Sequence, residues 1–181
     1  MATLNGSPVE LAAALVLSLL LVIACVNDIR ARRIPNSLVG IVLVGGILAT
    51  TALDPVVPGL LRALAGVGVG LAIWLPGWLL RMMGAGDVKL FAATGAWLGP
   101  AGAVNAAIVA AVLGGVLALV WLFIRRGSAG ARQTLWATAV APRTLVDARS
   151  DPKRMRELVP YSLALAGGVM AQLAFPGLLL G

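Results

Sequence analysis

Long unbroken apolar runs, separated by short polar segments, make up most of the 181-residue chain. Runs of about 18 or more such residues are typical of membrane-spanning helices. We assign six spans, which cover about residues 9–27, 38–53, 59–80, 90–98, 101–124 and 160–179. The fourth run is short for a full crossing, so we expect its helix to begin near Asp87. The pattern therefore predicts an all-α polytopic membrane protein.

Proline and glycine residues divide and shape these runs. Pro35 cannot continue a helix, and Asn36 or Ser37 is then expected to cap the second helix. The turn between the fourth and fifth spans is expected at Gly99-Pro100. Glycines inside the second and third spans are expected to form close-packing faces. These are Gly45, Gly46, Gly66, Gly68 and Gly70.

The placement of charge sets the expected topology. Basic residues follow the first, third and fifth spans, and the turns after the second and fourth spans carry none. The positive-inside rule then places both chain ends outside and the three basic segments in the cytoplasm. We expect one integral membrane domain over residues 1–181, with a cytoplasmic loop at about 125–159. Attachment to anionic lipids is the role that we expect for this basic loop.

Composition excludes several classes of function. Hydrophobic residues make up 60% of the chain and the mean hydropathy is +0.99, which a soluble domain of this length does not tolerate. The net charge of +7 does not predict nucleic-acid binding, because the basic residues lie between spans. The chain has no histidine and one cysteine, Cys25, which excludes histidine-based catalysis and CxxC zinc sites. We interpret Cys25 as a helix-packing residue rather than a lipoprotein acylation site.

Two aspartates stand out as candidates for chemistry. Asp28 and Asp87 each border an apolar helix, where burial of a carboxylate is costly, and both are expected at the cytoplasmic face. A purely structural role is the alternative for each. Asp28 would then end a helix or pair with the arginines at 30–33, and Asp87 would cap the fourth helix. The other acidic residues are expected at the opposite face or in the basic loop.

Glycine strengthens the case for Asp87. Gly84 and Gly86 leave the backbone bare, so that another chain can approach the carboxylate closely. Lys89 would add positive potential nearby. A carboxylate beside exposed backbone is what cleavage of a peptide requires.

These two segments, Asp28-Ile-Arg-Ala-Arg-Arg-Ile-Pro-Asn36 and Gly84-Ala-Gly-Asp-Val-Lys-Leu90, resemble the type IV prepilin peptidase family of bacterial membrane aspartic proteases. Pro160-Tyr161 at the start of the last span is similar to that family as well. The resemblance implies catalytic aspartates at Asp28 and Asp87, with Pro35, Asn36, Gly84, Gly86 and Lys89 in supporting positions. It also implies that the two carboxylates lie close together, which the sequence alone does not establish.

The resemblance carries further expectations. Longer members have a cytoplasmic insertion with two CxxC pairs and a methyltransferase activity, and this chain has one cysteine. It therefore resembles the short, peptidase-only form of Flp or tight-adherence pilus systems, without the zinc-type insertion. The substrate would be a prepilin or pseudopilin, in the bacterial inner membrane, with no metal or cofactor and no nucleic acid as partner. Whether the enzyme forms a homodimer is left open.

Two other functions stay open from the residues. A small proton- or ion-coupled transporter would place carboxylates deep within spans. A non-catalytic subunit of a pilus or secretion machine would use the aspartates only to pair with arginines. In a peptidase, one carboxylate would activate water and the other would protonate the scissile carbonyl oxygen, with the two roles not assigned individually.

Overall fold

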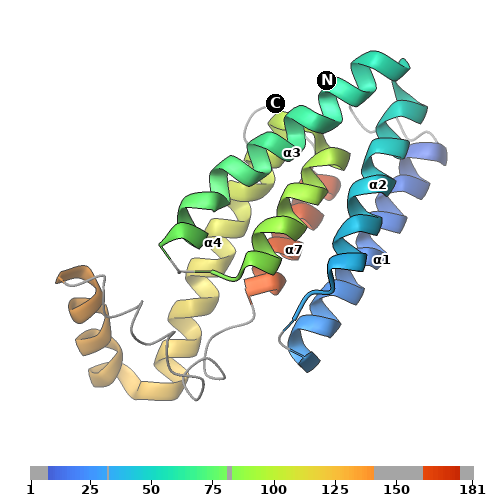
Figure 1. The fold of residues 1–181 in the computed structure, drawn as a ribbon. Coiled ribbons are helices and arrows are strands. Elements are labelled where there is room, and N and C mark those ends of the chain that lie inside the picture. The colour runs from blue at the N-terminus through green and yellow to red at the C-terminus, as the bar shows by residue number, and fades with distance from the viewer. Residues whose placement is uncertain (1–7, 32, 81–82, 141–160, 176–181) are drawn as a thin grey trace.

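The computed structural model describes residues 8–31, 33–80, 83–140 and 161–175, and every regular element among them is an α-helix. In chain order these helices are α1 (Pro8–Ala31), α2 (Asn36–Leu53), α3 (Val56–Leu79), α4 (Ala85–Val140) and α7 (Tyr161–Ala174). They lie side by side as a bundle (Figure 1). The predicted all-α class is confirmed for this part of the chain.

Four of the described helices are long and apolar enough to cross a membrane. They are α1, α2, α3 and the part of α4 from Ala85 to Ile124, which has 40 residues. Large apolar side chains cover the outside of the bundle, including Leu15 and Leu48, which are 66% and 63% exposed. An apolar exterior of this kind requires lipid as the surrounding solvent. The protein is therefore a multi-pass membrane protein.

Helix α4 contains the predicted fourth and fifth spans and reverses direction between them (Figure 1). Gly99 has a φ of 71°, a left-handed conformation that suits glycine, and Pro100 follows it. The predicted turn at this point is confirmed. The helix then continues to Val140, so the first part of the expected loop at 125–159 is helical. Residues 141–159, Pro160 and residues 176–179 lie outside the described part of the chain.

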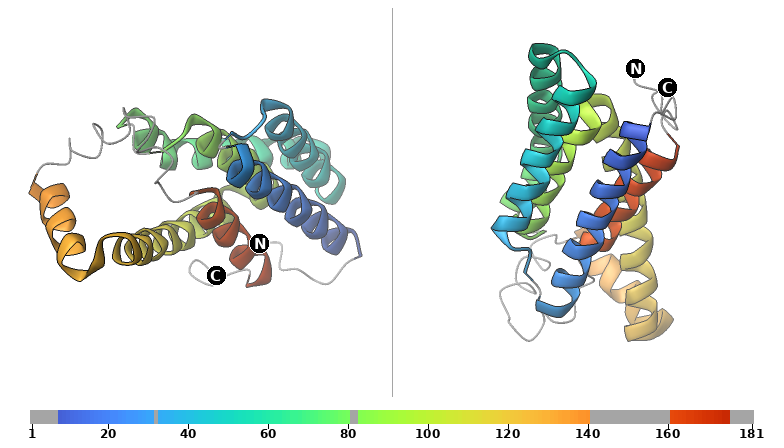
Figure 2. Two further views of the ribbon diagram at one scale, coloured as in Figure 1. Left: turned by 90° about the horizontal axis from the view of Figure 1, so that it is seen from below. Right: turned by 90° about the vertical axis from the view of Figure 1, so that its right-hand side faces the viewer.

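Small residues let α4 pack closely against its neighbours. A Cβ atom added to Gly66 of α3 would collide with the backbone carbonyl of Gly95 of α4, and one added to Gly95 would collide with Gly66. On α7, Gly168 lies in the same way against the carbonyl of Ala106. Helix α4 packs against both α3 and α7, and Figure 2 shows the bundle in two further views. Such close approach is what stabilises helix pairs in lipid.

The expected glycine faces are confirmed in part. Trp97 lies against both Gly45 and Gly46, and its indole Nε1 donates a 2.7 Å hydrogen bond to the Val42 carbonyl. Gly70 lies beside α4 as Gly66 does, but a Cβ on Gly68 would meet nothing within 4 Å. The inclusion of Gly68 was wrong because positions four apart share a helical face and positions two apart do not.

The two ends of the bundle carry different polar groups. At one end a cavity of about 180 Å³ is lined by Glu10, Asp54, Arg62 and Gln172 among others. Arg62 donates a 2.8 Å hydrogen bond to Asp54 there, as an ion pair. Glu10 and Asp28 lie 18 positions apart on α1, or about 27 Å at the helical rise. The bundle therefore separates Glu10 and Asp54 from Asp28.

The close contact of α3 with α4 predicts an asymmetry between two glycines on the same helix. We expect Gly66→Ala to lower the free energy of unfolding by roughly 1–3 kcal/mol, because its Cβ meets backbone that cannot rotate away. The matched control Gly68→Ala adds a methyl group in open space and should leave stability unchanged or slightly raised. Denaturant unfolding of both variants in detergent micelles measures this. Equal losses in the two variants would contradict the contact.

Candidate active site

Asp28 lies in the last turn of α1 and is half-buried. The hydroxyl of Ser162, in the first turn of α7, donates a 2.6 Å hydrogen bond to Asp28 Oδ2. Among the described residues, Asp28 forms no ion pair with Arg30 or Arg33. Its side chain therefore points to another helix, and the pairing with neighbouring arginines is not observed for these two.

Asp87 lies in the first turn of α4 and is also half-buried. The Val88 N–H donates to the Gly84 carbonyl at 3.4 Å, so Gly84 occupies the N-cap position. The interpretation of Asp87 as the N-cap is therefore wrong, because Ala85 and Gly86 enter the helix before it. Its carboxylate folds back over Gly84, where an added Cβ would lie 3.2 Å from Oδ2. Gly84 thus leaves room for the carboxylate.

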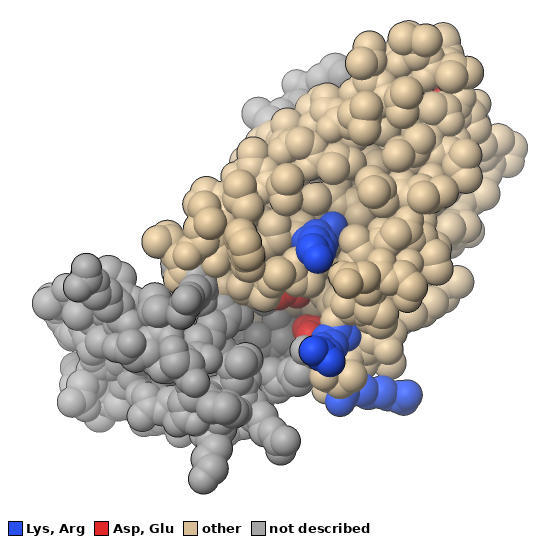
Figure 3. Space-filling view, in the orientation of Figure 1, with Lys and Arg blue, Asp and Glu red and all other residues tan. Residues whose placement is uncertain are grey.

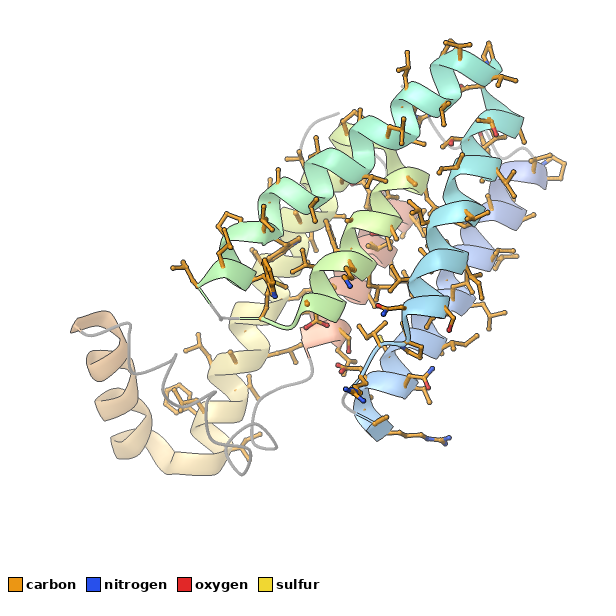
Figure 4. The ribbon with its side chains drawn as sticks, viewed as in Figure 1. Atoms are coloured by element: carbon orange, nitrogen blue, oxygen red, sulfur yellow. The ribbon has the colours of Figure 1, made fainter. Side chains whose placement is uncertain are left out.

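Cys25 connects the end of α1 to α7. It lies three positions before Asp28 on α1. Its thiol contacts the Ser162 carbonyl at 3.6 Å, which agrees with a packing role. Asp28 thus lies where the end of α1 meets the start of α7, and Asp87 lies in the first turn of α4 at the same end of the bundle, where Gly86 packs against Ile34. Figure 4 shows oxygen-bearing side chains at this end of the bundle.

The residues expected to support the aspartates lie at the start of α4 and in the segment before α2. A Cβ on Gly86 would lie 3.4 Å from Ile34, so the segment before α2 packs against the start of α4. Pro35 is the N-cap of α2, and its carbonyl accepts hydrogen bonds from Leu38 and Val39. The expected cap at Asn36 or Ser37 was wrong, because α2 begins at Asn36 with no side-chain cap.

Charge gathers at the same end. Lys89 and Arg33 are exposed, and acidic and basic side chains lie close together on the lower part of the face shown in Figure 3. The described residues contain no group of three side chains suited to hold a metal ion.

Ser162 is the site residue that the sequence did not reveal. A serine near the start of an apolar span has no distinguishing pattern, and the neighbouring Pro160-Tyr161 pair was the nearest signal. Its role appears only when α7 lies beside α1. The whole arrangement offers two carboxylates and a hydroxyl donor at the end of a helix bundle, which is suited to acid–base chemistry on a water molecule.

Comparison with known proteins agrees with this chemistry. The chain matches the type IV leader peptidase family over residues 15–119, more than half its length. The chain belongs to that family. The resemblance to the type IV prepilin peptidases is thereby confirmed, and the matched residues include both Asp28 and Asp87. No solved structure matches the chain.

Curated relatives in this family carry related names. A "prepilin leader peptidase/N-methyltransferase" of Xanthomonas campestris is 33% identical over 119 residues, which is 62% of this chain and 41% of the relative. The protein of the same name from Dickeya chrysanthemi is 37% identical over 106 residues, 55% of this chain and 37% of the relative. A "type 4 prepilin-like proteins leader peptide-processing enzyme" of Escherichia coli is 35% identical over 115 residues, 60% of this chain and 42% of the relative. The matches thus span about two fifths of these relatives.

The placement of Asp28 and Asp87 at one end of the bundle predicts that the two positions can be cross-linked. In a Cys25→Ala background, Asp28→Cys with Asp87→Cys should react with short bifunctional thiol reagents, because the end of α1 and the start of α4 lie at the same end of the bundle. The control pair Asp54→Cys with Asp87→Cys should not react, because Asp54 lies with Arg62 and Glu10 at the other end of the bundle. Mass spectrometry of the treated protein measures both. Equal yields for the two pairs would contradict this placement.

Proposed function

We propose that the chain is a membrane aspartic endopeptidase that cleaves the leader from type IV prepilin or pseudopilin precursors. The observation that carries this proposal is the placement of Asp28, in the last turn of α1, and Asp87, in the first turn of α4, at one end of the bundle, within a member of the leader peptidase family. The names of the curated relatives support the substrate class.

The reaction follows from two carboxylates in one site. Like charges at short distance disfavour double ionisation, so the pair holds one proton. The ionised carboxylate takes a proton from water, and the water oxygen attacks the scissile carbonyl carbon. The protonated carboxylate donates to the carbonyl oxygen and assists departure of the amine. No metal or cofactor takes part in this proposal.

The same geometry favours a peptidase over a transporter. Asp28 is three positions from the end of α1, and Asp87 is in the first turn of α4. A proton-relay path would need carboxylates in the middle of the spans. Helix ends instead place the carboxylates where water and an extended peptide reach them.

The proposal includes the topology of the protein in the membrane and its location in the cell. With six spans and the basic segments inside, both chain ends lie outside and the aspartates face the cytoplasm. The protein would then reside in the bacterial inner membrane, where the apolar helix of a precursor can enter from the bilayer. Assignment to the short form that serves Flp-type pili stays a prediction. A homodimer stays a prediction.

The catalytic pair predicts the loss of cleavage in two single variants. Asp28→Asn and Asp87→Asn should each reduce processing of a Flp-type precursor by roughly 10²-fold or more, because each removes one acid–base group. Asp54→Asn, at the other end of the bundle, is the matched control and should retain processing.

The measurement is the rate of leader removal in membrane vesicles, followed by electrophoresis, with the thermal stability of each purified variant recorded alongside. Normal cleavage by either Asp28→Asn or Asp87→Asn contradicts the proposal. Lost cleavage together with lost folding in both variants would support the non-catalytic subunit instead.

A further inference from the structure

Ser162 joins the site from a helix outside the region that matches the family, residues 15–119. Its side chain is fully buried, at 0% exposure, and its hydroxyl donates to Asp28 Oδ2 at 2.6 Å. The two residues are 134 positions apart. Complete burial of a polar side chain is costly unless its hydrogen bond is made, so this contact is a defined feature of the fold.

The partner of Ser162 is unusual for a helical hydroxyl in this protein. Ser18 donates to the carbonyl of Ala14 in its own helix at 2.7 Å, and Thr50 and Thr94 likewise donate to carbonyls of their own helices. Such local bonds are the common behaviour of serine and threonine in helices. Ser162 instead reaches across to a carboxylate, and 2.6 Å is typical of a hydroxyl that donates to an ionised acid.

A second contact fixes the same two helices at the same place. The Cys25 thiol lies 3.6 Å from the Ser162 carbonyl, one turn before Asp28. Elsewhere α1 presents much of its surface to lipid, and Leu19, for example, is 62% exposed. The position of the Asp28 carboxylate therefore depends on α7, and on Ser162 in particular.

We propose that Ser162 is a positioning residue, which holds the Asp28 carboxylate in the rotamer that faces Asp87. This inference rests on the proposed function, since it assigns to Ser162 a part in the cleavage reaction. With Oδ2 engaged by the hydroxyl, Oδ1 is the oxygen left for the water molecule. Without the hydroxyl, the side chain of Asp28 can rotate toward the polar surface and away from Asp87. The reactive geometry is then reached less often, while the substrate still binds.

The test compares Ser162→Ala, Ser162→Thr and Ser18→Ala in the full-length protein, reconstituted in lipid, with a Flp-type precursor as substrate. Ser162→Ala should lower kcat roughly tenfold or more with KM unchanged, because a hydrogen bond to a charged group is lost. Ser162→Thr keeps the hydroxyl and should restore most of kcat. Ser18→Ala removes a local helical bond and should leave kcat unchanged.

A stability measurement makes the test independent of catalysis. In a double-mutant cycle, Ser162→Ala and Asp28→Ala should have coupled, non-additive effects on the melting temperature, because each removes one partner of the same bond. If Ser162→Ala does not fold, Ser162→Cys takes its place, since a thiol is of similar size and a weak donor.

The outcomes separate this inference from the proposed function. Normal kcat in Ser162→Ala, with Asp28→Asn inactive, overturns the positioning role and leaves the peptidase intact. Additive effects on the melting temperature, or a change in KM alone without rescue by threonine, also overturn it. Normal cleavage by Asp28→Asn overturns both.

Discussion

The backbone contact between Gly66 of α3 and Gly95 of α4 is the constraint on which the arrangement depends. In lipid, apolar side chains gain little by leaving their solvent, so helices associate where their backbones approach closely enough for dense packing. This contact holds the first half of α4 antiparallel to α3. The start of α4, with Asp87, therefore lies at the end of the bundle where α3 finishes. A side chain at either glycine would separate the helices and displace that start.

A second small-residue contact extends the same logic to α7. Gly168 packs against Ala106 and Ala110 in the second half of α4, after the reversal at Gly99. Because α4 turns back on itself and α7 runs antiparallel to its second half, the start of α7 returns to the end that holds Asp87. Two tight packing contacts and one glycine turn thus bring Ser162 beside Asp28. None of these packing contacts involves either carboxylate.

The sequence predicted the features that depend on local pattern, such as helices and turns. It did not predict the contacts that form only when helices pack together. Apolar runs predicted α1, α2 and α3 to within four residues, and the Gly99-Pro100 turn followed from backbone chemistry, but α4 extends well beyond the predicted fifth span. The predicted helix caps were wrong. The N-cap positions are Pro35 for α2 and Gly84 for α4, which lie one to three positions before the polar residues that we expected there. Asp28 and Asp87 were singled out as candidates because a carboxylate beside an apolar run is costly, and their catalytic role stays a prediction. Ser162 was not found, because a hydroxyl has no such cost until its helix is packed.

The same packing explains why the carboxylates can remain at the edge of an apolar bundle. Asp87 lies in the first turn of α4, and Asp28 accepts its hydrogen bond from the first turn of α7. Each carboxylate is therefore placed at the positive end of a helix, where the partial charge of the unpaired N–H groups stabilises an anion. Two helix starts at this end of the bundle thus offset part of the cost of placing carboxylates beside an apolar core. Such an arrangement needs no buried cation.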